Sequence, residues 1–83
     1  MKYIIFQNLN GKKIPILFPE DESYQQVADT FKRATTLTIS SAGKVSINDS
    51  DLFCHSAAND IGYKPTPDDE QTIIRAMKET DLR

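Results

Sequence analysis

Residues 3–18 decide the fold, and they read Tyr3-Ile4-Ile5-Phe6-Gln7-Asn8-Leu9, then Asn10-Gly11, then Lys12-Lys13-Ile14-Pro15-Ile16-Leu17-Phe18. Two apolar runs separated by Asn-Gly are typical of a β-hairpin, because both residues tolerate the positive φ angles of a two-residue type I′ turn. Such a turn predicts the opposed pairs Leu9 with Lys12, Gln7 with Ile14, Ile5 with Ile16, and Tyr3 with Phe18.

The predicted hairpin is apolar on both faces near its open end. Side chains alternate between the faces of a strand. One face therefore carries Tyr3, Ile5, Ile14, Ile16 and Phe18, and the other carries Ile4, Phe6, Pro15 and Leu17. An ordinary exposed hairpin has one polar face, so we expect cover on both. We expect two helices to cover one face and a second subunit to cover the other, which makes Ile4, Phe6, Pro15 and Leu17 the candidate interface.

Two helices are predicted after the hairpin. The first spans residues 24–34, with Ser23 as its N-cap and an apolar stripe formed by Tyr24, Val27, Ala28, Phe31 and Ala34. The second spans residues 67–79, with Thr66 as its N-cap, Pro67 at the first position and Asp68, Asp69 and Glu70 in the first turn. We expect residues 80–83 to fray.

Between these helices the sequence alternates as strands do. Residues 35–41 are rich in β-branched side chains, and residues 44–47 resume the alternation after Ala42-Gly43. That dipeptide is either a turn or a bulge inside one long strand; we favour the bulge. Asn48-Asp49-Ser50-Asp51 predicts a turn, and residues 52–56 predict a strand. The element order is ββαββα. The sequence thus predicts one domain over residues 1–83, an α+β fold whose small antiparallel sheet has both helices packed on one face.

Composition excludes several classes of function. The net charge of −2 over 83 residues gives little attraction for nucleic acid or anionic lipid, so we expect neither as a partner. A single cysteine, Cys54, rules out an internal disulfide and is typical of a reducing compartment. The apolar run after Met1 is too short for a signal peptide or a membrane helix, so we expect a cytoplasmic protein.

The chemically active residue types form no recognisable site. Cys54 and His55 are neighbours on a predicted strand and so point to opposite faces, which excludes a direct nucleophile–base pair. Asp49, Asp51 and Asp60 lie near them, but at no known metal-ligand spacing. Ser41-Ala42-Gly43-Lys44 lacks the first glycine of a phosphate loop. We therefore expect no enzyme activity, no cofactor and no metal.

Three stretches carry a resemblance to a family. They are Lys2-Tyr3-Ile4-Ile5-Phe6 with Pro15-Ile16-Leu17-Phe18-Pro19, Ser41-Ala42-Gly43-Lys44-Val45-Ser46-Ile47, and Cys54-His55-Ser56 with Ile61-Gly62-Tyr63-Lys64-Pro65-Thr66-Pro67-Asp68-Asp69. Together they resemble small proteins of unknown activity encoded by tailed phages and prophages. The chain departs from that pattern at residues 55–57 and 64–67, where the family tends to have Gly and Ser, and Ser-Arg-Pro. The resemblance implies a setting in a mobile element and no chemistry.

Three functional hypotheses follow. The first is a phage- or prophage-type accessory module that binds protein, either as a homodimer or with a host protein. The second is a small enzyme or metal protein that uses Cys54 and His55. The third is an inhibitor of a host nucleic-acid enzyme, acting through the acidic groups at residues 20–22 and 68–70.

Overall fold

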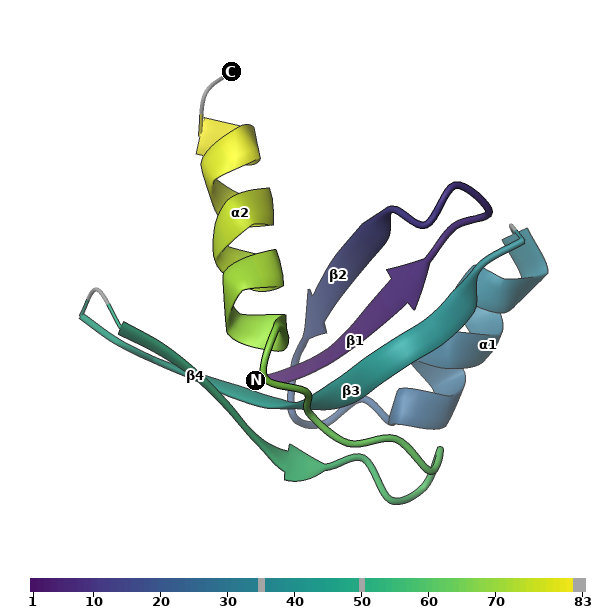
Figure 1. The fold of residues 1–83 in the computed structure, drawn as a ribbon. Helices are drawn as coiled ribbons and strands as arrows, with labels where there is room; N and C mark the ends of the chain where they lie inside the picture. Colours follow the sequence, from purple (N-terminus) through teal and green to yellow (C-terminus); the bar gives the residue numbers. More distant parts are fainter. Residues whose placement is uncertain (35, 50, 82–83) are drawn as a thin grey trace.

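The computed structural model describes residues 1–34, 36–49 and 51–81 and shows an α+β fold (Figure 1). The elements are β1 (Lys2–Gln7), β2 (Lys13–Phe18), α1 (Tyr24–Ala34), β3 (Thr38–Asn48), β4 (Asp51–Ala57) and α2 (Asp69–Asp81). The strands form one antiparallel sheet in the order β2-β1-β3-β4. The predicted ββαββα order and α+β class are confirmed.

The register of the first hairpin differs by one residue from the prediction. Gln7 pairs with Lys13 and Tyr3 with Leu17. The chain reverses through a longer loop, in which the Gly11 N–H donates to the Asn8 carbonyl at 3.0 Å and Gly11 takes a φ of 82°. The Asn8 side chain also accepts hydrogen bonds from two loop N–H groups. Three-residue loops of this kind place glycine in the left-handed region after a β-turn, so one glycine suffices.

The shifted register turns every side chain of β2 to the opposite face. Ile16 and Phe18 now pack with Ile4 and Phe6, whereas Leu17 packs with Tyr3 and Ile5 on the other face. The hairpin is still apolar on both sides, as the sequence predicts. What differs is which residues share a side.

The two helices cover opposite faces of the sheet, so the prediction of both helices on one face is wrong (Figure 1). Tyr24, Val27 and Ala28 of α1 pack on the face of Ile4 and Phe6. Ile73 and Ile74 of α2 pack on the face of Tyr3 and Ile5. The physical reason is that β1, fully buried from residue 3 to residue 6, requires an apolar layer above and below, and each layer is supplied by one short amphipathic helix.

Strand β3 runs without a break through Ala42-Gly43, which confirms one long strand rather than a turn. Two register shifts interrupt its pairing. One lies between Gly43 and Lys44, where the pairing with β4 skips Ser56, and the other skips Ser40 opposite β1. Gly43 has a further role. A Cβ atom there would lie 2.6 Å from Pro65 Cγ and 2.7 Å from the Ser56 carbonyl oxygen, so glycine permits the close approach of these segments.

The long β3 is staggered between its neighbours. Its pairing with β1 ends at Lys44, and the remaining residues pair only with β4. Residues 46–48 and 51–53 therefore form a two-stranded ribbon, which projects beyond β1 and β2 in Figure 1. The predicted turn joins its strands, with Asp49 at a φ of 51°; Ser50 lies outside the described residues.

The helix boundaries agree closely with the prediction. The bounds of α1 coincide with the predicted 24–34, and the Gln26 N–H donates to the Ser23 hydroxyl at 3.1 Å, as an N-cap requires. Helix α2 begins two residues later than predicted and continues to Asp81. The predicted strand start at Thr35 lies outside the described residues. The fraying predicted for residues 80–83 starts too early, because α2 includes residues 80 and 81; residues 82 and 83 lie outside the described residues.

Candidate functional site

The candidate interface of Ile4, Phe6, Pro15 and Leu17 is not a surface of the folded chain. Ile4 and Phe6 are fully buried, and the Phe6 ring lies 5.4 Å from that of Phe31 in α1. Pro15 and Leu17 are half-buried, and Leu17 packs with the cluster on the opposite face. The four residues were placed together by the predicted register, and the one-residue shift separates them. This interface prediction is therefore wrong.

Cys54 and His55 face opposite sides of β4. Cys54 packs against the α2 side, where burial raises the pKa of its thiol to about 11 with a further contribution from the Asp69 and Glu70 carboxylates. His55 is exposed, and its ring nitrogens hydrogen-bond to the Ser46 and Ser56 hydroxyls at 2.9 Å each. The thiol is thus protonated at neutral pH and has no contact with the imidazole.

The described residues contain no group of three histidine, cysteine or carboxylate side chains that could hold a metal ion. The three acidic residues that lie near Cys54 and His55 in the sequence are exposed: Asp49, Asp51 and Asp60. Among the described residues, these carboxylates do not gather with Cys54 or His55 into a group that could hold a metal ion.

The buried carboxylate of Asp69 was not singled out from the sequence. It is 1% exposed and accepts four hydrogen bonds. The donors are the Tyr3 hydroxyl at 2.5 Å, the Ser41 hydroxyl at 2.7 Å, and the Thr66 hydroxyl and backbone N–H at 2.6 and 2.9 Å. The bond back to the Thr66 N–H is half of a capping box, a pattern visible as Thr66 followed three residues later by an acid.

These contacts define the charge state of the network. Burial raises the pKa of the Asp69 carboxyl, but hydrogen bonds from Thr66, Tyr3 and Ser41 lower it, and the net pKa lies below the ordinary 3.8. Burial and the adjacent carboxylate raise the pKa of Tyr3 above its ordinary 10.0. Asp69 is therefore ionised and Tyr3 neutral at pH 7. Because the donors come from β1, β3 and the loop before α2, the carboxylate fixes the start of α2 on the sheet.

Both open edges of the sheet carry features that oppose strand pairing with another chain. Pro15 removes one N–H from the edge strand β2. On the other edge, the Cys54 N–H of β4 donates to Glu70 Oε2 of α2 at 3.0 Å. Charged or prolyl residues at sheet edges are a common protection against edge-to-edge association.

An apolar groove lies between the ribbon and α2. Its volume is about 260 Å³. Its apolar lining residues are Ile47, Leu52, Ile74 and Met77, and its charged ones are Asp49, Asp51 and Lys78. Ile47 is 50% exposed and Met77 44%, although both are large apolar side chains. We call this feature the ribbon groove.

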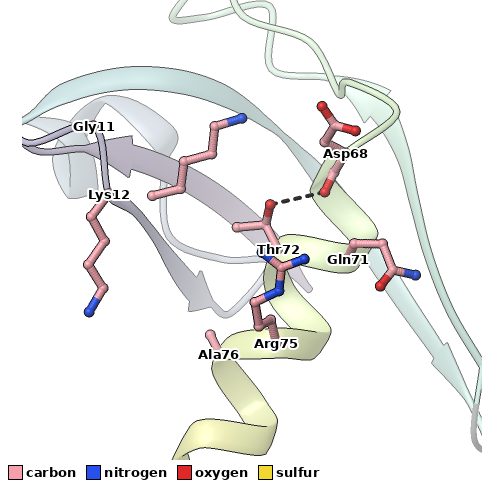
Figure 2. A pocket seen from close by; sticks show the side chains of 8 residues that line it. Gly11, Lys12, Asp68, Gln71, Thr72, Arg75 and Ala76 are labelled. Atoms are coloured by element: carbon pink, nitrogen blue, oxygen red, sulfur yellow. Dashed lines mark hydrogen bonds between the residues drawn. The ribbon is translucent and has the colours of Figure 1, made fainter.

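A second, polar cleft of about 620 Å³ lies on another side of α2 (Figure 2). One wall is the β1–β2 loop, and the other is the first half of α2. The lining residues are Gly11, Lys12, Lys13, Asp68, Gln71, Thr72, Arg75 and Ala76. In Figure 2 Lys12 lies across from the α2 residues, and the Thr72 hydroxyl donates to the Asp68 carbonyl at 3.0 Å. We call this feature the basic cleft.

Comparisons with protein-family profiles, with curated proteins and with solved structures found no match to this chain. Within the described residues, neither helix is long and apolar enough for a membrane crossing.

Proposed function

We propose that this protein is a non-enzymatic protein-binding module that self-associates through the ribbon groove. The resemblance to tailed-phage and prophage proteins supports an accessory role in a mobile element, in the cytoplasm of a bacterial host. The observation that carries the proposal is the half-exposed pair Ile47 and Met77 on the two walls of one groove.

The position of these side chains argues for a binding surface. A two-stranded ribbon has little stability by itself in water. Here one face of the ribbon contacts α2 through Leu52, while Ile47 is left half uncovered. A second apolar layer over the groove would remove Ile47 and Met77 from water, each worth roughly 1 kcal/mol at half of a full side-chain burial.

The charges around the groove favour a second copy as the occupant. The ribbon wall carries Asp49 and Asp51, and the helix wall carries Lys78. A two-fold axis through the groove places each acidic wall against the partner's basic wall, because an isologous interface uses the same surface on both subunits. Pairing through the edge strands β2 and β4 is the less favourable route, since Pro15 and Glu70 obstruct them.

Sedimentation equilibrium over a range of protein concentrations tests this proposal. We expect a concentration-dependent dimer for the natural sequence and a monomer for Met77→Lys, which places a second cation beside Lys78 in the groove. Leu9→Lys is the matched control, because Leu9 is 84% exposed in the β1–β2 loop, outside the groove. It should dimerise like the natural sequence.

A charge exchange makes the test specific to the proposed geometry. Lys78→Glu alone should weaken the dimer, and adding Asp51→Lys should partly restore it, because the charges at positions 51 and 78 would again be opposite. A natural sequence that remains monomeric at every concentration would refute self-association. Equal weakening by Leu9→Lys would refute the ribbon groove as its location.

The other two hypotheses have less support. An enzyme built on Cys54 and His55 would need side chains that the fold directs to opposite faces. An acidic inhibitor would need free carboxylates, yet Glu20 forms ion pairs with the Met1 amino group at 3.3 Å and with Lys44 at 3.4 Å, and Asp69 is buried.

A further inference from the structure

The basic cleft gathers three cations in a protein of net negative charge. Lys12 and Lys13 come from the β1–β2 loop and the start of β2, and Arg75 comes from α2, a distance of more than sixty residues along the chain. Among the residues that the structure describes, none of the three forms an ion pair with a carboxylate, including Asp68 in the same cleft. The fold therefore places these three cationic side chains on the walls of one cleft, with Lys12 on the loop side and Arg75 on the helix in Figure 2.

Both walls of the cleft are held in place by hydrogen bonds. The Lys12 backbone is fixed by Asn8, whose side-chain oxygen accepts the Lys12 N–H at 2.9 Å and whose own N–H donates to the Lys12 carbonyl at 3.0 Å. The α2 wall is fixed by the buried Asp69 network. Fixed walls lower the ordering cost that a ligand must offset, so they favour binding.

The charge and size of the cleft indicate the class of ligand. Three cations and the Asp68 carboxylate leave a local charge of +2. A phosphate monoester carries about −1.5 to −2 at pH 7, whereas a single carboxylate carries less. Arg75 offers the forked donor that binds phosphate oxygens in pairs, and the lysines add point charges. The volume of the cleft, about 620 Å³, is in the usual range for small-molecule sites.

We propose that the basic cleft binds a small molecule through a phosphate group, with Arg75, Lys12 and Lys13 as its ligands. The site is separate from the ribbon groove, which uses Ile74, Met77 and Lys78 on another side of α2. Asp68 restricts the cleft to strongly anionic ligands, because a weak anion would not compensate for its repulsion.

A nuclear magnetic resonance titration of the full chain with inorganic phosphate tests this site. At constant ionic strength we expect saturable shifts of the backbone amides of Lys12, Gln71, Thr72 and Arg75. Acetate, the monocarboxylate probe, should bind at least about tenfold more weakly, since it lacks the second charge. Arg75→Gln should weaken phosphate binding about tenfold or more, and Lys32→Gln on the exposed side of α1 should leave it unchanged.

Two further variants separate this site from alternatives. Asp68→Asn should tighten phosphate binding, because it removes the negative charge of Asp68 from the cleft. Met77→Lys should not change it, even where it abolishes dimerisation. The proposal would be overturned if the amide shifts did not saturate with phosphate. It would also be overturned if Arg75→Gln and Lys32→Gln bound phosphate equally well while the dispersed spectra of both variants showed that they were folded.

Discussion

Replacing Asp69 tests how α2 is held on the sheet. In Asp69→Asn the amide oxygen can accept two of the four hydrogen bonds, and the amide NH₂ must donate to hydroxyls that now turn to accept. The backbone N–H of Thr66 cannot turn, so the oxygen has to occupy the Oδ2 position that bonds Thr66 and Tyr3. The NH₂ then faces Ser41 and the Thr66 hydroxyl.

The expected loss follows from the charge. Hydrogen bonds to a charged group contribute about 1.5–3 kcal/mol and neutral ones about 0.5–1.5, so four bonds lose roughly 4 kcal/mol. Because the neutral amide avoids the cost of burying a charge, about 2 kcal/mol of this loss is offset. We expect Asp69→Asn to lower the free energy of unfolding by about 2 kcal/mol. Asp69→Ala leaves buried donors unpaired at about 1–3 kcal/mol each, enough to unfold a domain of this size.

Urea denaturation followed by circular dichroism measures this difference, and its pH dependence identifies the carboxylate. The pKa of Asp69 is lower in the folded state than the ordinary 3.8, so its contribution is present above that value and is lost as pH falls through the folded pKa. The difference in free energy of unfolding between the natural sequence and Asp69→Asn should therefore become smaller at acid pH. Equal stability of the two proteins at pH 7 would refute the role given to the carboxylate.

Two further predictions concern Cys54 and Gly43. Cys54, with a pKa of about 11 against an ordinary 9.0, should react with iodoacetamide at pH 8 roughly a hundredfold more slowly in the folded than in the urea-unfolded chain, and similar rates would contradict its burial. Gly43→Ala should lower the free energy of unfolding by about 1–3 kcal/mol or more, measured by thermal unfolding, because the added Cβ meets Pro65 and backbone oxygens. The control Gly62→Ala should lower it by about 1 kcal/mol, because the φ of 76° strains an alanine although no atom lies near its Cβ. Equal losses of stability in the two variants would argue against crowding at Gly43.

Local signals in the sequence predicted the elements well. Ser23 and the spacing of Tyr24, Val27 and Phe31 define α1 to the residue, because capping and periodicity are local. The hairpin itself follows equally from its two apolar runs. Its register does not, because Asn10-Gly11 fits a two-residue turn, while the Asn8 side chain stabilises a three-residue loop with the same glycine.

The arrangement in space depends on contacts that no local pattern contains. Tyr3 and Ser41 lie 66 and 28 residues from Asp69, and their hydroxyls give its carboxylate a buried role. In the sequence Asp69 is one acid among three at a helix start, where the helix dipole already accounts for it. The Thr66–Asp69 spacing is the one signal that could have distinguished it.

The most direct test of the fold is a set of nuclear Overhauser contacts from the alternating side chains of β1. We expect Phe6 to show contacts with Val27 and Phe31 of α1, and Tyr3 and Ile5 to show contacts with Ile73 of α2, in a sample diluted to monomer. Contacts from both helices to the same β1 side chains would place them on one face and contradict the account.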